Sequence, residues 1–178
     1  MEIYNNKLES FVLEKCKLVP LKENSDSDKY LNWLKDENIN QFLEARFDRY
    51  SRPSLRNVIR NIIESKNTLF YGIYSLDGIH IGNIKLGPIN EHHKFADIGF
   101  LIGDKNFYRK GIATEALKKV CNYAFSLGVA KITAGAYENN LASIATLKKV
   151  GFSIEGYRSN YVSFKGNRIG VYIFGLNP

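Results

Sequence analysis

The chain is poor in the residues that build metal centres and disulfide frameworks. Its 178 residues include only two cysteines, Cys16 and Cys121, and three histidines. Two cysteines are too few for a disulfide framework or a four-ligand zinc site, and neither has a neighbouring histidine that would mark a nucleophile. His92 and His93 are adjacent in a polar stretch, and His80 lies in an expected strand. The sequence therefore predicts no metal.

Long hydrophobic runs are also missing. No apolar stretch approaches the ~18 residues that span a bilayer. The first residues, MEIYNNKLESFVLEKC, contain early glutamates and only a short apolar run, which is unlike a signal peptide. These absences predict a cytoplasmic protein without a membrane partner. The length favours a single domain, residues 1–178, with one sizeable core.

Positive charge, in contrast, is in excess. Lysine and arginine number 25 against 18 acidic residues, a net charge of +7. The positive residues are scattered and no DNA- or RNA-binding motif is present, so we predict no nucleic-acid partner. Attraction of a polyanionic small molecule, such as a coenzyme A or a nucleotide sugar, explains the charge with fewer assumptions. The composition leaves a monomer and a homodimer equally open.

The most informative stretch is residues 95–127. Residues 95–102 are apolar and rich in β-forming residues, which predicts a strand. After a polar loop, apolar residues recur at helical spacing: Ala113, Ala116, Leu117, Val120, Ala124 and Leu127. A glycine at the start of a helix lets a diphosphate approach the free N–H groups, and Arg109 and Lys110 add positive charge beside Gly111. A packed helix that begins at a turn glycine explains the same residues as simply.

The other segments predict an α+β order. One helix is expected after the cluster of capping residues 24–28, and another, capped by Ser54, runs up to Ile63, with a looser helical run between them. Further expected elements are strands at 16–21, 68–76, 79–86, 129–137, 152–164 and 168–176 and a helix at 140–150. Because a helix joins strands 95–102 and 129–137, these two should be parallel neighbours. We expect a mixed, mostly antiparallel sheet of about seven strands with about four helices.

The segment YRKGIATEA, from Tyr108 to Ala116, resembles the acyl-CoA diphosphate loop of the GNAT superfamily of N-acetyltransferases. The usual pattern is Gln or Arg, two residues, Gly, one residue, then Gly or Ala; Gly111 and Ala113 match it. Thr114 and the Glu-Ala that follows are typical of the branch with the ribosomal-protein N-terminal acetyltransferases. Tyr108 departs from the pattern, at a position where the family uses backbone amides more than the side chain. The order of elements is similar to the family over nearly the whole chain.

This resemblance implies acetyl-CoA as cosubstrate, with its pantetheine arm between splayed strands 95–102 and 129–137. Backbone groups of Leu101 and Ile102 would pair with the arm, and Asn140 would hold it from the other side. On the residues alone, Asn140 and Ser143 are more simply the start of a capped helix. The diphosphate would lie on the amides of six consecutive residues: Arg109, Lys110, Gly111, Ile112, Ala113 and Thr114.

Acetyl transfer to an amine needs a base for the amine, and a proton donor assists the leaving thiolate. Ser143 resembles the serine suggested as donor in the ribosomal-protein branch, whereas Leu147 stands where many members have a tyrosine. Asp97, Glu138 and Glu155 are the candidate bases. A structural role explains each of these three carboxylates as well.

The candidate acceptor-binding residues are Arg46, Arg49 and Tyr50. Arginine side chains suit phosphate or carboxylate and a tyrosine ring can stack on a base or sugar, which favours a nucleotide-linked amino sugar. A solvated loop whose arginines pair with Asp48 and Glu44 explains them equally. Resemblance to the ribosomal-protein branch implies a protein N-terminus or another primary amine instead. A non-catalytic acyl-CoA-binding protein is the remaining alternative.

Overall fold

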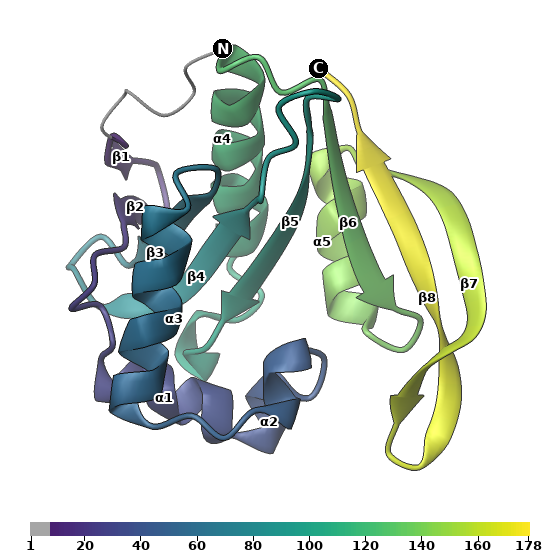
Figure 1. Cartoon of the computed structure of the whole chain (residues 1–178), viewed down its shortest axis with the longest axis horizontal. Helices are drawn as coiled ribbons and strands as arrows, with labels where there is room; N and C mark the ends of the chain where they lie inside the picture. Colours follow the sequence, from purple (N-terminus) through teal and green to yellow (C-terminus); the bar gives the residue numbers. More distant parts are fainter. Residues whose placement is uncertain (1–7) are drawn as a thin grey trace.

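The computed structural model describes residues 8–178; residues 1–7, part of the stretch predicted to lack a signal peptide, lie outside this range. One eight-stranded sheet has the strand order β1-β2-β3-β4-β5-β6-β8-β7 (Figure 1). Its strands are Phe11–Val12 (β1), Lys17–Pro20 (β2), Leu69–Tyr74 (β3), His80–Leu86 (β4), Phe95–Ile102 (β5), Lys131–Tyr137 (β6), Ser153–Phe164 (β7) and Asn167–Leu176 (β8).

Five α-helices accompany the sheet within residues 8–178. They are Asp28–Lys35 (α1), Glu37–Asn40 (α2), Arg52–Glu64 (α3), Ile112–Ser126 (α4) and Leu141–Val150 (α5), with 3-10 turns at Glu44–Phe47 (η1) and Lys105–Phe107 (η2). The predicted α+β class with a mixed, mostly antiparallel sheet is confirmed. The structure has one strand more than expected, because β1 is too short to produce a periodic pattern, and α2 falls within the looser helical run expected before α3, which makes five helices rather than about four.

The cap of α3 differs from the prediction. Ser51, not Ser54, is the N-cap, since its hydroxyl accepts the N–H of Ser54 at 3.2 Å. Ser54 returns the bond by accepting the N–H of Ser51 at 2.8 Å, which completes a capping box. Pro53 lies in the first turn, where its missing N–H has no helical partner to lose. The helix therefore begins before the proline rather than after it.

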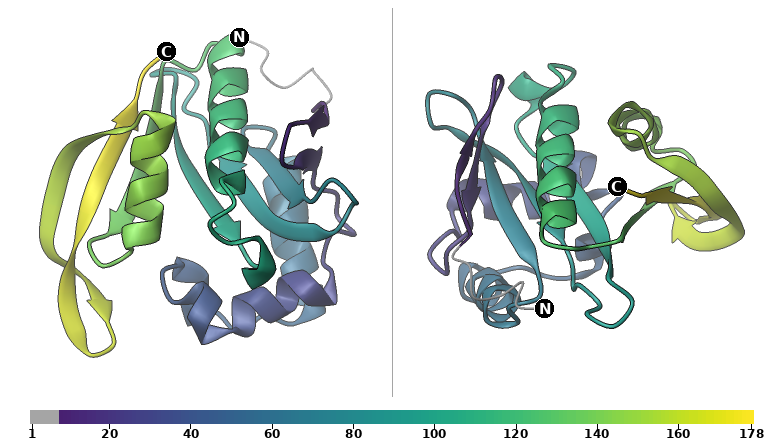
Figure 2. Two further views of the ribbon diagram at one scale, coloured as in Figure 1. Left: turned by 180° about the vertical axis from the view of Figure 1, so that it is seen from behind. Right: turned by 90° about the horizontal axis from the view of Figure 1, so that it is seen from above.

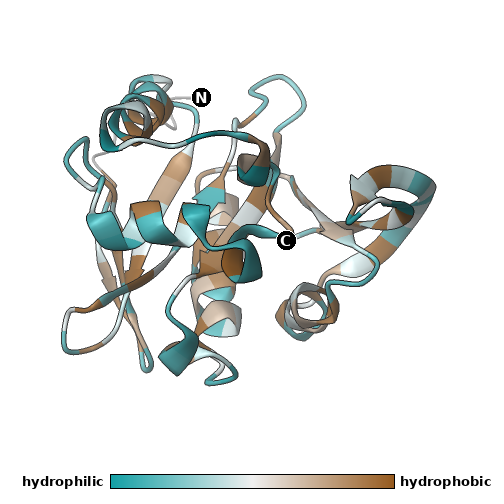
Figure 3. Cartoon of the chain, turned by 90° about the horizontal axis from the view of Figure 1, so that it is seen from below, coloured by the Kyte–Doolittle hydropathy of each residue, from teal (hydrophilic) through white to brown (hydrophobic). Residues whose placement is uncertain are grey.

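Helices cover both faces of the sheet. Helices α4 and α5 lie on one face, where Ala116, Leu117 and Leu147 join the larger core cluster with the strands (Figure 2). Helices α1 and α3 cover the opposite face over β2 and β3, with Leu31 and Ile59 in a second cluster. Seen from below, β6, β8, β7 and α5 stand to one side of the other elements, and the helices carry both hydrophilic and hydrophobic residues (Figure 3).

The central parallel pair separates along its length. Strands β5 and β6 pair only at their beginnings, over three positions from Phe95 opposite Lys131 to Asp97 opposite Thr133. Beyond Asp97, β5 stays paired with β4 as far as Ile102, while β6 stays paired with β8. The two strands therefore diverge toward their C-terminal ends (Figure 1). We call the space between their unpaired parts the wedge.

The structure also bears on metals, cysteines and membranes. Burial raises the pKa of the Cys16 and Cys121 thiols to about 12, so both thiols are protonated at neutral pH. Across residues 8–178 no three histidine, cysteine, aspartate or glutamate side chains gather as a metal site. None of the helices in that range is long and apolar enough to cross a bilayer.

Candidate active site

The register of β5 decides which of its backbone groups face the wedge. The N–H of Gly87 donates to the carbonyl of Asp97 at 2.8 Å, and the N–H of Gly103 donates to that of Ile81 at 2.9 Å. Odd-numbered residues of β5 therefore bond to β4, because antiparallel pairing uses every second residue. The backbone N–H and C=O groups that face the wedge belong to Ile98, Phe100 and Ile102.

This register corrects one predicted contact. Leu101 lies opposite Asn83 of β4, so its backbone groups point away from the wedge. Ile102, the other predicted residue, has backbone groups on the wedge side, and Phe100 takes the place given to Leu101. The prediction was wrong because it used two consecutive residues, whose backbone groups point in opposite directions across a strand.

The facing edge of β6 is unpaired in the same way. The N–H of Glu138 donates to the carbonyl of Gly170 at 3.0 Å, so even-numbered positions bond to β8. The backbone groups of Gly135 and the N–H of Tyr137 then face the wedge, whereas the carbonyl of Tyr137 accepts the N–H of Asn140 at 2.9 Å. Two open strand edges can take up an extended, amide-bearing ligand as though it were an additional strand. The pantetheine arm of coenzyme A has this character.

The N-terminus of α4 lies beyond the end of β5. Gly111 is the N-cap with φ 77°, and Arg109 has φ 60°, both in the left-handed region. The first helical bond joins the N–H of Glu115 to the carbonyl of Gly111 at 3.1 Å. The amides of Ile112, Ala113 and Thr114 therefore have no acceptor within the helix and are available to an anion. The side chain of Ile112 is buried, so only its backbone can serve this role.

Asn140 and Ser143 together open α5. The side-chain oxygen of Asn140 accepts the N–H of Ser143 at 3.2 Å, and Gly151 ends the helix with φ 117°. The cap uses the oxygen of Asn140, and its amide nitrogen remains a donor for a ligand. Ser143 is half-buried one turn into α5. Leu147, in the position of the family's usual tyrosine, is 1% exposed in the core and has no proton to donate.

The face opposite α4 and α5 carries Asp97. Ala96, Ile98, Ile132 and Ala134 lie in the core beneath the helices, so the side chains that alternate with them point to the other face. There Asp97 of β5 accepts a hydrogen bond from the hydroxyl of Thr133 of β6, at the closed end of the wedge.

Next along each strand on this face is a glycine. A Cβ on Gly99 would have nothing within 4 Å, and one on Gly135 would meet only Val171, at 3.8 Å. The two strand edges beside Asp97 thus carry no side chain. The absence of side chains leaves open space beside this carboxylate.

The other two candidate bases bind protein groups elsewhere. Glu138 accepts a hydrogen bond from Tyr157 of β7, and this bond and one from the backbone of Gly170 lower the pKa of the Glu138 carboxyl. Glu155 forms an ion pair with Lys131 across the sheet. Such contacts give each carboxylate a structural role. Asp97 alone of the three lies at the closed end of the wedge, next to the open parts of the two strands.

The predicted acceptor residue Arg46 belongs to a hydrogen-bond network at the open end of the wedge. Its Nη1 donates to the hydroxyl of Tyr137 at 2.9 Å, and its Nη2 donates to the carbonyl of Ser163 at 3.2 Å. Tyr137 in turn donates to Glu44 at 2.5 Å. Burial first, then the bond to Glu44, raises the pKa of Tyr137. Phe42 and Phe164 stack with ring centroids 5.3 Å apart beside this network. Arg46 therefore links η1 to the ends of β6 and β7.

The other predicted acceptor residues lie outside this network. The hydroxyl of Tyr50 donates to Asp48 at 3.1 Å and its ring packs on the second core cluster. Arg49 is exposed. Arg52 forms an ion pair with Asp28 at 2.7 Å. The structure thus brings Arg46 to the wedge but not Arg49 or Tyr50.

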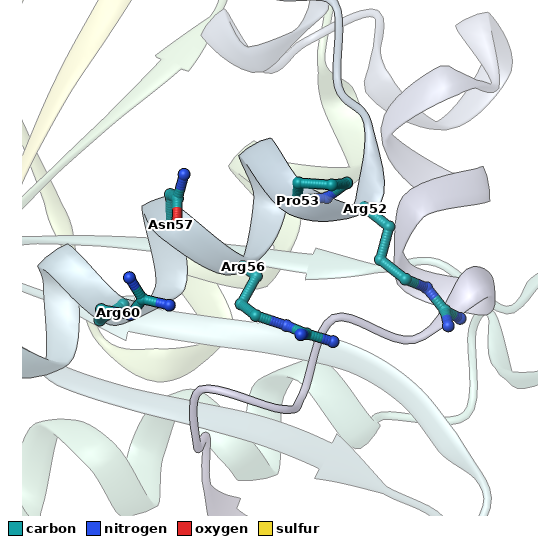
Figure 4. A pocket seen from close by; sticks show the side chains of 5 residues that line it. All are labelled: Arg52, Pro53, Arg56, Asn57 and Arg60. Carbon is teal, nitrogen blue, oxygen red and sulfur yellow. The ribbon is translucent and has the colours of Figure 1, made fainter.

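Two surface pockets lie along α3, away from the wedge. One is lined by Arg52, Pro53, Arg56, Asn57 and Arg60 (Figure 4), the other by Lys22, Glu23, Asn24 and Arg56. The arginines face acidic partners: Arg56 pairs with Asp26 at 2.9 Å and Arg60 with Glu23 at 2.5 Å. This ladder of ion pairs attaches α3 to the segment before α1 and neutralises the charge that an anionic ligand would need.

A family model described as "Acetyltransferase (GNAT) domain" matches residues 15–153. The chain belongs to the GNAT acetyltransferase family. One relative, an uncharacterized N-acetyltransferase p20 from Bacillus licheniformis, is 36% identical over 97 residues, 54% of this chain and 54% of the relative. The chain thus spans about half the length of this curated relative.

Solved structures share the fold. The ribosomal L7/L12 alpha-N-protein acetyltransferase RimL, in complex with coenzyme A, superposes with a TM-score of 0.84 at 18% identity, covering 95% of this chain and 98% of that one. A spermidine N-acetyltransferase from Vibrio cholerae, in complex with CoA and spermine, gives a TM-score of 0.82 at 20% identity and covers 93% and 96%. The branch with ribosomal-protein acetyltransferases, expected from the diphosphate loop, is among these neighbours.

Sequence reasoning missed Phe100 and Tyr137, and it named Glu44, which lies 3.9 Å from Arg46, only as a partner of the loop arginines. The alternation of backbone directions along β5 could have indicated Phe100. The backbone groups of Gly99 and Leu101 bond to β4, so those of Phe100, which lies between them, face the wedge. Tyr137 is the last residue of an apolar strand and carried no separate signal. Glu44 and Tyr137 are 93 positions apart in the chain, and no local pattern connects them.

Proposed function

We propose that the protein transfers the acetyl group of acetyl-CoA to a primary amine by direct attack within a ternary complex. The observation that carries the proposal is the wedge with two unpaired strand edges and the free amides at the start of α4. The pantetheine arm would bond to Phe100 and Ile102, with Asn140 on the other side. The diphosphate would bind the amides of residues 109–114.

The chemistry assigned to the site is an exchange of two bonds. A protonated amine first gives up one proton, because only the neutral amine attacks. Its nitrogen then attacks the thioester carbonyl and the C–S bond breaks, and the proton that the nitrogen loses after the attack balances the one that the thiolate gains. Asp97, directly or through a water, would take the proton from the amine. Ser143 would donate to the sulfur. The remainder of the acceleration comes from holding the two reactants in line.

The acceptor favoured by the structure is a cationic amine rather than an anionic nucleotide-linked sugar. Arg46, the predicted arginine that lies at the wedge, already donates to Tyr137 and Ser163, so its charge is engaged by the protein rather than offered to an anionic acceptor. The carboxylates of Asp97 and Glu44 lie at the closed and open ends of the wedge. Asp97 accepts a hydrogen bond from Thr133, and Glu44 accepts one from Tyr137 and lies 3.9 Å from Arg46, but both side chains are exposed, that of Glu44 to 75%. A protonated amine is attracted to such carboxylates before it loses its proton.

An acceptor panel tests the proposal. The protein is incubated with acetyl-CoA and, separately, with a peptide bearing a free N-terminus, a polyamine, and a nucleotide-linked amino sugar, and the released thiol is counted. We expect thiol release with the peptide or the polyamine. Tight binding of acetyl-CoA without release against any amine would contradict the transfer and support an acyl-CoA-binding role.

A further inference from the structure

The turn between β1 and β2 is attached to the first turn of α4. The carboxylate of Glu115 accepts the N–H of Glu14 at 3.1 Å and the N–H of Lys15 at 3.0 Å. The thiol of Cys16 also approaches this carboxylate, at 3.6 Å. One glutamate of the helix thus holds three consecutive residues that lie about a hundred positions earlier in the chain.

This attachment brings the side chain of Lys15 to the entrance of α4. The Lys15 ammonium nitrogen is 3.3 Å from the point where a Cβ on Gly111 would lie. No carboxylate oxygen of residues 8–178 forms an ion pair with it. Glu115 is used for the backbone of the turn, and its carboxylate does not pair with the ammonium.

The Lys15 ammonium lies at the end of the helix that favours anions. A helix N-terminus carries a partial positive charge, and cations are stabilised at the opposite end of a helix. Arg109 and Lys110 add two formal positive charges within two residues of Gly111. A third ammonium at this point becomes favourable when an anion lies between it and the amides.

We propose that Lys15 binds the diphosphate of the cosubstrate together with the amides of α4, and that Glu115 positions it by holding the β1–β2 turn. The inference rests on the proposed function, because it requires that the diphosphate lies at Gly111. It adds a contact from the N-terminal hairpin, an element outside the diphosphate loop itself. Lys15 is a binding residue in this assignment and Glu115 is a positioning residue.

Binding of coenzyme A and of 3′-dephospho-coenzyme A, measured by calorimetry, tests the assignment. Lys15→Met should raise the Kd of both ligands about tenfold, because both carry the diphosphate and the variant loses one charge-assisted hydrogen bond. Lys15→Arg should recover most of the affinity. Lys22→Met, which removes the same charge from an exposed lysine at a pocket along α3, is the matched control and should leave Kd unchanged.

The positioning role has its own measurement. Glu115→Gln should raise Kd in the same direction, and the Lys15→Met/Glu115→Gln double variant should bind no more weakly than Lys15→Met alone. Additive losses would show that Glu115 does not act through Lys15. A Kd for Lys15→Met within twofold of the wild type, or a loss confined to coenzyme A with its 3′-phosphate, would overturn the diphosphate contact.

Failure of this inference is distinguishable from failure of the proposed function. If the wild type binds neither ligand, the acetyl-transfer proposal and the Lys15 contact both fall. If the wild type binds and Gly111→Val weakens binding while Lys15→Met does not, only the Lys15 contact is wrong.

Discussion

The two sides of the wedge are assembled differently. The proposed cofactor side consists mainly of β5, the following loop and the first turn of α4, residues 95–114, to which Asn140 and Lys15 are added from other parts of the chain. The acceptor side joins Arg46 of η1, Tyr137 of β6 and Ser163 of β7, which are 91 and 117 positions from Arg46. One side is therefore mainly a local structure and the other a product of long-range contacts.

This difference separates two kinds of physical cause. On the proposed cofactor side most of the contacts come from backbone groups set by short-range conformation: a left-handed glycine, free amides and strand edges. Lys15 is the long-range addition to this side. On the acceptor side, side chains act, and their contacts exist only once distant elements have packed. Changes on the cofactor side should affect coenzyme affinity, and changes on the acceptor side should affect the amine and the packing of η1.

The largest effect is expected where the two sides meet, at Asp97. Asp97→Asn keeps the side-chain size and an oxygen for Thr133 but removes the base, so kcat/KM for the amine should fall about 100-fold. The acetyl-CoA Kd should not change. Steady-state kinetics and calorimetry measure the two quantities. Glu138→Gln is the matched control, and an equal loss there would remove Asp97 as the distinct base.

The next effect belongs to the cofactor side. Gly111→Val adds a branched side chain at φ 77° and toward Lys15, so the KM for acetyl-CoA should rise at least about tenfold. Gly78→Val is the control for strain, since Gly78 has φ 90° with nothing within 4 Å of its Cβ position and lies in a distant turn. Equal KM values for both variants would place the diphosphate elsewhere.

Ser143 tests the role of the α5 side. Ser143→Ala should lower kcat about tenfold, near the lower end of proton-transfer effects because a thiolate with a pKa near 8.5 already leaves readily. The Kd for acetyl-CoA should stay within twofold. If turnover is unchanged at saturating substrates, Ser143 has only its place in the helix cap.

The acceptor side should respond in stability as well as in kinetics. Arg46→Ala removes hydrogen bonds to Tyr137 and Ser163 and should lower the free energy of unfolding by about 2 kcal/mol. It should also raise the KM for the amine and leave that for acetyl-CoA unchanged. Denaturant unfolding and steady-state assays measure these changes. Arg49→Ala, in an exposed position of the same loop, should alter neither; a matching loss there would point to a general effect of charge.

The smallest effect concerns Glu138. Tyr157→Phe removes the hydrogen bond that stabilises the charged carboxylate, so the Glu138 pKa should rise toward its usual value. In the wild type, the bond from Tyr157 stabilises the folded protein at pH values above the usual glutamate pKa. This stabilisation is lost as the pH falls through the lowered pKa of Glu138. A side-chain NMR titration measures the shift. An unchanged pKa, or a loss of turnover in this variant, would contradict the structural role of Glu138.

Much of the fold could be predicted from local signals. Strand β5 begins and ends as predicted, Gly111 and Asn140 open their helices, and Gly151 ends α5. The cap of α3 was misplaced by about one helical turn, and the choice of Leu101 was wrong by one strand position. Such errors arise because hydrophobic periodicity locates an element better than it locates its end or its bonded edge.

The sequence by itself determined the α+β order, the helix start that suits a diphosphate, and the family, because these depend on residues that are neighbours in the chain. Only the tertiary structure decided that Arg46 bonds to Tyr137, that Asp97 lies on the open face, and that Lys15 reaches Gly111. The physical reason is that a side chain's partners depend on how elements pack. Packing brings together residues whose separation in the chain leaves no periodic trace.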